Sequence, residues 1–337
     1  MREAMAEKIT LKTLSERLGI STMAVSLAIN GKPGVSEGTR MRVLALAEEL
    51  NYRPDAIAQS LRLSETKTLG LVIADSTLSL FAPIIDGVEK TAAEYGYQII
   101  LVNAHSNALE EQKAVRTLVG KRIDGMLLAA SMLTDRKYKR FLAGANVPYL
   151  YLVRRCSYRD GDYVVSDNVG SCREMVTHLV EKGGGPVHFL NLPRPATAAS
   201  DRLSGYRQAL EGSGQAYDEG LVHHIEPTID AGHGTILGIL DSGETVRSVF
   251  CGCDLIAVGV MQGLWERGLS VPGDVRVAAH DDIEIARYLG VPLTTIRVPL
   301  FEIASLGTRE LIEKIKTGSD QRIRRALLSE LVFRDSA

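Results

Sequence analysis

Residues 9–31 read ITLKTLSERLGISTMAVSLAING, and this stretch decides how the N-terminal part of the chain folds. Between Leu11 and Leu18, leucines recur at spacings of three and four residues, as one face of a helix requires. Gly19 is expected to end that helix, and Ser21 is a good N-cap for a second one. A helix, a tight turn containing glycine and a second helix together make the layout of a helix-turn-helix.

A third helix and a short fourth helical segment are predicted next. The third helix follows Ser36 and places apolar residues on one face, namely Val43, Leu44, Ala47 and Leu50. Residues 51–54 read NYRP and break it, and residues 55–62 form helices well but are too few for a stable isolated helix. Such a segment can order on a partner, and apolar wedges of this kind can enter the minor groove of DNA. The alternative is a plain three-helix bundle with no role in DNA binding.

The runs ISTMAVSLAINGKPGVSEGTRMRVL (20–44) and NYRPDAIAQSL (51–61) make this head resemble the lactose/galactose repressor family. The resemblance implies that the second helix reads the major groove of an operator. It also implies a hinge helix, about 55–62, that orders on the DNA and inserts a leucine. By position, the resemblance implies that Thr22, Met23 and Leu27 read base edges. It implies phosphate contacts at Ser21, Ser26, Asn30, Ser36 and Thr39. The hinge would contribute Ala58, Leu61 and Arg62, and Thr10 completes the DNA-binding set.

Two residues of the second helix depart from the family pattern. Ala24 replaces the usual threonine, which removes one phosphate hydrogen bond. Leu27 stands where a polar reader such as arginine or histidine is common, and leucine can touch a thymine methyl but cannot hydrogen-bond a base. We therefore expect an operator that differs from those of arginine-reading relatives.

Residues 68–337 alternate apolar runs of strand length with helical patterns. Such alternation predicts parallel sheets covered on both faces, and its two series predict two doubly wound subdomains of periplasmic-binding-protein type. The family resemblance extends through this α/β body and implies that it dimerises and binds a small-molecule effector. Ligands of such folds bind at the carboxyl ends of strands, so the cleft between the lobes is the expected site. We expect a head at 1–67, a first lobe at 68–163 plus 297–322, and a second lobe at 164–296 plus 323–337.

Arg202 and Asp281 match the main polar effector positions of the family. The alternative for this pair is a salt bridge between the lobes or at the surface. Phe81 matches an aromatic wall on which a ring could stack, and its alternative is core packing. Further candidates for effector contact are Leu80, Ser131, Ile225, Cys253 and Asp254.

The resemblance favours a sugar or sugar derivative as effector, with a purine base as the alternative. Residues 251–259, which read CGCDLIAVG, are closer to the purine repressor than to sugar-binding members of the family. Ala196 and Ala198, however, stand where the purine repressor would have arginine and threonine. Cys253 replaces an asparagine that would pair with vicinal hydroxyl groups.

The composition and the remaining motifs argue against other classes of protein. The chain has 337 residues, 45% hydrophobic and 24% charged, which suits a globular protein of two or three domains. No apolar run reaches the roughly twenty residues of a membrane span, and residues 1–10 lack the apolar run of a signal peptide. We therefore expect a cytoplasmic protein with no membrane partner. Residues 1–67 carry a net charge of +2 and the rest −4, which is compatible with DNA binding by the head.

Several motifs fall short of a catalytic or metal site. The four cysteines lack zinc-binding spacing and are expected to be reduced, partly buried thiols. Residues 232–238, GHGTILG, miss the dinucleotide fingerprint by one position. Residues 322–325, RIRR, fit a solvated turn, and no leucine-heptad tail follows residue 331, so a homodimer is expected. With no catalytic constellation, metal or cofactor expected, the sequence predicts a repressor that binds a pseudo-palindromic operator under the control of an effector. The rival classes are a small-molecule binding protein with no DNA role, which would need a signal peptide, and an α/β enzyme.

Overall fold

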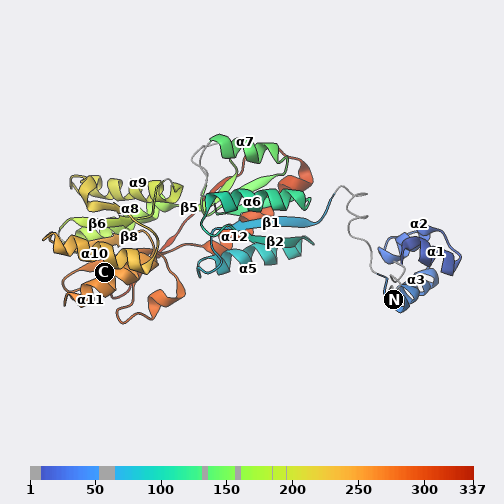
Figure 1. The fold of residues 1–337 in the computed structure, drawn as a ribbon, viewed down its shortest axis with the longest axis horizontal. Coiled ribbons are helices and arrows are strands. Elements are labelled where there is room, and N and C mark those ends of the chain that lie inside the picture. Colours follow the sequence, from blue (N-terminus) through green and yellow to red (C-terminus); the bar gives the residue numbers. More distant parts are fainter. Residues whose placement is uncertain (1–8, 53–64, 131–135, 156–160, 184, 195) are drawn as a thin grey trace, which may run out of the picture. The chain divides into compact units, whose positions relative to one another are not determined.

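The computed structural model describes residues 9–52, 65–130, 136–155, 161–183, 185–194 and 196–337 (Figure 1). Contacts divide the chain into two units, Met1–Thr66 and Lys67–Ala337. Each unit is described by itself below. Within the described ranges, no helix is both long enough and apolar enough to cross a membrane.

The head unit contains α1 (Leu11–Leu18), α2 (Thr22–Ile29) and α3 (Glu37–Glu49). The helices are capped by the hydroxyl groups of Thr10, Ser21 and Ser36 respectively. Each hydroxyl accepts a hydrogen bond from the backbone N–H of the residue three positions later. Gly19 ends α1 with a left-handed φ of 65°, a conformation that glycine adopts without strain. The predicted helix-turn-helix is therefore confirmed.

The three head helices enclose a small core of four buried apolar residues: Leu14, Val25, Ala28 and Val43. Ala47 and Leu50 pack against this core, as expected from their spacing on α3. Leu44 was expected on the same face, but its side chain is 43% exposed. The prediction was wrong for Leu44 because it follows Val43 directly, and adjacent helix residues point about 100° apart.

The body unit contains two lobes, each built on one six-stranded sheet. The first sheet has the order β11-β5-β4-β3-β1-β2, and the second β12-β10-β9-β8-β6-β7. All pairings are parallel except that of β10 with β12. The first lobe comprises β1 (Thr68–Ile73), β2 (Gln98–Asn103), β3 (Gly125–Ala129), β4 (Tyr149–Leu152), β5 (Tyr163–Ser166), β11 (Arg324–Leu327), α5 (Phe81–Glu94), α6 (Ala108–Gly120), α7 (Arg136–Gly144) and α12 (Leu300–Thr317).

The second lobe pairs helices α8 with α9 and α10 with α11 around its sheet. Adjacent residues of β8 point into opposite layers, since Val249 joins one buried cluster and Phe250 the other. This burial on both faces explains the continuous apolar runs in the sequence. The lobe comprises β6 (Val187–Asn191), β7 (Val222–His224), β8 (Ser248–Cys251), β9 (Arg276–Asp281), β10 (Thr294–Arg297), β12 (Glu330–Val332), α8 (Asn168–Gly183), α9 (Thr197–Gly212), α10 (Ile229–Asp241) and α11 (Asp254–Glu266).

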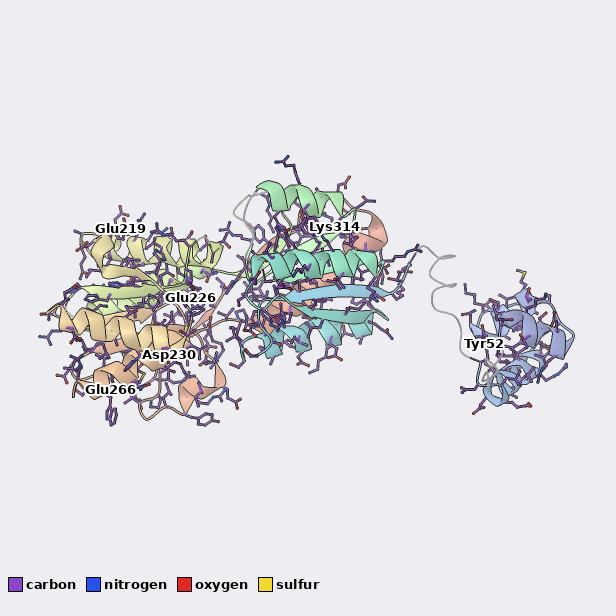
Figure 2. The ribbon with its side chains drawn as sticks, viewed as in Figure 1. Tyr52, Glu219, Glu226, Asp230, Glu266 and Lys314 are labelled. Carbon is purple, nitrogen blue, oxygen red and sulfur yellow. The ribbon has the colours of Figure 1, made fainter. Side chains whose placement is uncertain are left out.

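The expected boundaries between the lobes were wrong at β5 and β11. Both strands were assigned to the second lobe, but β5 pairs with β4 and β11 pairs with β5, so both belong to the first sheet. The carboxylate of Asp162 anchors this edge, because it accepts bonds from Lys314 Nζ of α12 at 2.5 Å and from the N–H of Ile323 at 3.1 Å (Lys314 is labelled in Figure 2). The chain thus crosses between the lobes three times: after β5, after β10 and after β11.

The structure also corrects two smaller predictions. Arg324 and Arg325 lie in strand β11 and not in a turn, although both are exposed as expected. The glycine-rich run 232–238 forms the middle of α10. Of its three glycines, Gly232 allows α10 and α11 to approach closely, because a Cβ there would lie 2.2 Å from the carbonyl oxygen of Ile256. A hydrogen bond of 2.8 Å between His233 and Glu266 joins the same two helices.

Candidate functional site

The exposed face of α2 in the head carries three of the residues expected to bind DNA. Ser21, Thr22 and Met23 are exposed, and Met23 has 72% of its side chain accessible. Leu27 is half-buried, and its Cδ1 atom lies 3.1 Å from where a Cβ of Gly34 would be. The centre of this face therefore lacks a large polar side chain that could hydrogen-bond a base. Leu27 offers a base only an apolar surface.

The remaining head candidates cluster at helix ends. Ser21 and Ser36 stand at the N-termini of α2 and α3, where free N–H groups and the helix dipole favour phosphate. Asn30 donates to the carbonyl oxygen of Ser26 at 2.7 Å and so closes the C-terminal end of α2. Thr10 and Thr39 belong to the capping interactions of α1 and α3. Ala58, Leu61 and Arg62 of the expected hinge lie outside the described residues.

Arg40 is a structural residue of the head that sequence analysis did not single out. Its Nη2 donates to the carbonyl oxygen of Lys32 at 2.9 Å, and its Nη1 donates to that of Ala28 at 3.4 Å. These bonds hold the turn between α2 and α3. Its position four residues after the N-cap Ser36 gave no signal of that role.

In the body, residues from both lobes enclose a cavity of about 70 Å³. Five of the eight effector candidates line it: Leu80, Phe81, Arg202, Cys253 and Asp281. Ile225 packs against a core of the second lobe and is not among the lining residues, and Ser131 lies outside the described residues. The other described lining residues are Leu78, Ser79, Ala129, Val153, Arg154, Leu192, Ala198, Pro227, Leu255 and Ile283.

Arg202 of α9 is buried at one side of this cavity. Its Nε donates to the Oδ1 atom of Asn168 at 3.0 Å, its Nη1 donates to the carbonyl oxygen of Gly252, and its Nη2 lies 3.7 Å from Asp281 Oδ1. A buried guanidinium is costly unless its donors are satisfied, and these partners satisfy it. Arg202 therefore ties α9 to the starts of α8 and α11 and holds Asp281 at the cavity wall.

Asp281 sits at the end of β9 in a strained backbone conformation. Its φ is 122°, a region that residues with side chains rarely adopt, and Asp282 follows with a φ of 56°. Asp282 is anchored by Arg334 at 2.6 Å and by Arg297 at 2.7 Å. The burial of neighbouring His280 lowers its pKa to about 4, so this ring is neutral near pH 7.

Asp254 is a candidate that the structure turns away from the cavity. Its carboxylate accepts the N–H of Ile283 at 2.7 Å and the hydroxyl of Thr295 at 2.6 Å, and it is not among the lining residues. Burial and the nearby charge of Asp281 raise the pKa of Asp254 well above its usual range. Its position thus fixes the loop that carries Asp281 and Ile283.

Arg154 is the charged residue of the cavity wall that sequence analysis missed. It follows β4 and lines the cavity, and its side chain is half-buried. Burial, and then the charge of Arg202, lower the pKa of Arg154. The rule that ligands bind beyond the carboxyl ends of parallel strands could have pointed to it.

An ion pair next to the cavity joins the two lobes. Arg155 of the first lobe donates to both carboxylate oxygens of Asp201 on α9, at 2.7 and 2.9 Å. The hydroxyl of Thr197 also donates to the carbonyl oxygen of Arg155 at 2.8 Å. A more open hollow of about 350 Å³ adjoins this pair. The smaller, enclosed cavity is the better candidate site because it is the one that holds Arg202 and Asp281.

Comparisons with known proteins agree with this architecture. Residues 66–328 match the family of periplasmic binding proteins and sugar binding domain of LacI family, and residues 10–55 match the bacterial regulatory proteins of the lacI family. The chain therefore belongs to the lacI family of bacterial regulatory proteins, and the resemblance noted from its motifs is confirmed.

Two relatives show how far the similarity extends. The ribose operon repressor of Escherichia coli K12 is 32% identical over 328 residues, covering 97% of this chain and 99% of the relative. The transcriptional repressor PurR of Vibrio atlanticus LGP32 is 31% identical over 309 residues, covering 91% and 92%. Both relatives are named as repressors, the first of the ribose operon and the second as a repressor of helix-turn-helix type.

Solved structures place the fold in the same group. The transcriptional regulator CelR in complex with cellobiose is 29% identical with a TM-score of 0.76, covering 98% of this chain and all of that one. The lac repressor dimer bound to operator has a TM-score of 0.88 at 24% identity, covering 98% and 99%, which speaks for the fold alone. The predicted head and two-lobed α/β body are confirmed.

Proposed function

We propose that this protein is a transcription repressor that binds a pseudo-palindromic operator as a homodimer and responds to a small effector, a sugar or sugar derivative, held between its lobes. The observation that carries the proposal is the combination in one chain of a capped helix-turn-helix and a cavity built around Arg202 and Asp281. The ribose operon repressor and PurR are named as repressors, and the regulator CelR was solved with cellobiose. We infer that the protein is a cytoplasmic regulator and not an enzyme.

The DNA-binding surface would be the exposed face of α2, with phosphates at the N-termini of α2 and α3. Thr22 and Met23 are open to a groove, and half-buried Leu27 offers only apolar contact. A single head would bind weakly, whereas two linked heads would recognise two half-sites at once. Each subunit of the homodimer would therefore read one half of the operator.

An apolar surface on the second lobe supports the homodimer. Trp265, the single tryptophan of the chain, lies on α11 with 77% of its side chain exposed. Together with Met261, Leu269 and Leu289 it borders a hollow of about 500 Å³. Exposed apolar patches of this kind mark protein interfaces, and aromatic residues are enriched there.

A purine base as corepressor is the second candidate effector, because PurR is among the relatives. The side chains of Ala196 and Ala198 speak against it. Neither can hydrogen-bond a base, and Ala198 is among the residues that line the cavity.

The proposal is tested by selecting operators from a random DNA library with the full-length protein. We expect a two-fold symmetric site, bound as a dimer, whose half-site differs from that of arginine-reading relatives because of Leu27. Selection of the arginine-type half-site would refute the reading of Leu27, and absence of any selected site would refute the proposed function. Repeating DNA binding with sugars and purine bases then distinguishes the two effector classes.

A further inference from the structure

Val153, which lines the cavity directly after β4, has a strained backbone. Its φ is 63°, a left-handed value that is unfavourable for a β-branched side chain. The N–H of Arg154 donates to the carbonyl oxygen of Leu152 at 2.6 Å, which closes a three-residue γ-turn centred on Val153. A γ-turn with a positive φ is rare and strained. The structure therefore holds Val153 in a conformation that valine does not favour by itself.

The γ-turn ends the run of β4 beside β5. Leu152 still pairs with Val164 of β5, and the N–H of Val153 donates to the carbonyl oxygen of Val164 at 3.0 Å. With an ordinary negative φ, Val153 would continue β4 alongside β5. The positive φ instead directs the chain to α9 of the second lobe, where Arg155 is bound.

Arg155 is held by α9 at both its side chain and its backbone. Its Nη2 donates to the two carboxylate oxygens of Asp201, at 2.7 and 2.9 Å. Its N–H donates to the hydroxyl oxygen of Thr197 at 3.3 Å, and its carbonyl oxygen accepts from the same hydroxyl at 2.8 Å. Strained conformations persist only where the surrounding contacts enforce them, so these bonds between the lobes maintain the γ-turn.

Backbone strain at the opposite wall of the cavity is maintained differently. Asp281 has a φ of 122° and Asp282 a φ of 56°. The carboxylate of Asp282 accepts hydrogen bonds from Arg297 and Arg334, which belong to the same lobe. That strain is held within one lobe, whereas the strain at Val153 depends on contacts between the two lobes.

We propose that the γ-turn at Val153 favours separation of the lobes, because it is strained while Arg155 is bound to α9 and relaxes when the lobes part. The inference rests on the proposed function, since it concerns how that regulator responds to its effector. A ligand that closes the lobes must supply the strain energy of the γ-turn. Val153 therefore sets the balance between the open and closed states, and with it the affinity for such a ligand.

Hydrogen exchange of the Arg155 amide in the full-length, ligand-free protein tests the proposal, because this N–H is bonded across the lobes. Glycine and asparagine accept a positive φ, so V153G and V153N relieve the strain. We expect the Arg155 amide to exchange at least about fivefold more slowly in both variants than in the wild type. V153A should be intermediate. V153T is the matched control, because threonine is also β-branched, and it should exchange like the wild type.

Two further amides separate the proposal from a general gain in stability. The N–H of Ile225 donates to the carbonyl oxygen of Asn191 within the second lobe, and its exchange should be the same in every variant. D201N weakens the hold of α9 on Arg155, so it should speed exchange of the Arg154 amide in the γ-turn.

Four results would each overturn the proposal: wild-type exchange of the Arg155 amide in V153N, equal slowing in V153T, equal slowing of the Ile225 amide, or unchanged exchange of the Arg154 amide in D201N. These measurements use neither effector nor operator. Operator selection tests the proposed function separately, so failure of one is distinguishable from failure of the other.

Discussion

The replacement of Gly259 by alanine tests how closely α10 and α11 must approach. A Cβ on Gly259 would lie 2.0 Å from the carbonyl oxygen of Ile229 and 2.6 Å from the backbone nitrogen of His233. Both atoms belong to the backbone of α10, so no side chain can rotate away. The helices would have to separate by about 1 Å, and close-packed interiors resist such shifts.

The destabilisation expected from overpacking in G259A is partly offset by the higher helix propensity of alanine. Overpacking of this kind costs typically about 1–3 kcal/mol, and the backbone contact places G259A near the upper end. Alanine favours a helix over glycine by about 1 kcal/mol, which offsets part of the cost. We therefore expect the free energy of unfolding to fall by about 2 kcal/mol.

The measurement is urea unfolding followed by circular dichroism, with G238A as the control. Gly238 lies on the exposed face of α10, and a Cβ there would meet nothing within 4 Å. G238A should therefore leave stability unchanged or raise it by up to about 1 kcal/mol. The reasoning fails if G259A unfolds at the same urea concentration as the wild type, or if G238A is equally damaging.

Three further outcomes are expected. D201N removes the charge that binds Arg155 across the lobes, so it should weaken effector binding. It should lower the free energy of unfolding by about 1 kcal/mol or less, since the ion pair is partly exposed. An unchanged affinity for the effector in calorimetry would contradict this prediction. S21A should lose about 1 kcal/mol of head stability through the lost cap, while S21D should keep the cap but lose DNA affinity because its charge repels phosphate; hydrogen exchange and DNA titration separate the two effects. The pKa of His280 is about 4 in the folded protein and about 6.5 in the unfolded chain, so the wild type loses stability as the pH falls below 6.5. H280N lacks this titration, so between pH 7 and pH 5 its free energy of unfolding should fall by up to about 2 kcal/mol less than that of the wild type. Urea unfolding at both pH values measures this, and equal losses in both proteins would contradict it.

The sequence predicted the elements whose signal is local. Leu14 and Val25 follow helical spacing within the head, and buried β8 is one continuous apolar run. The family motifs also led to Arg202 and Asp281, which the structure brings to one cavity. Their contact with an effector stays a prediction.

Features that depend on residues distant in the chain could not be predicted from the sequence. The run 229–241 contains three glycines and gave no clear helical signal, because it is helical chiefly through its packing on α11. Strand β11 carries exposed arginines and pairs with β5, about 160 residues earlier, which no local pattern reveals. Arg154 follows an apolar strand, and the cavity that it lines is formed by residues of both lobes.

The pairing of β11 with β5 and of β12 with β10 has a consequence for synthesis on the ribosome. Residues 324–332 complete the outer strand of both sheets, so neither lobe can finish its sheet until almost the whole chain has been translated. The head depends on contacts among residues 11–50 and can fold early. A chain that stalls or breaks before residue 324 would therefore expose a finished head beside two open sheet edges, the kind of edge on which chains aggregate.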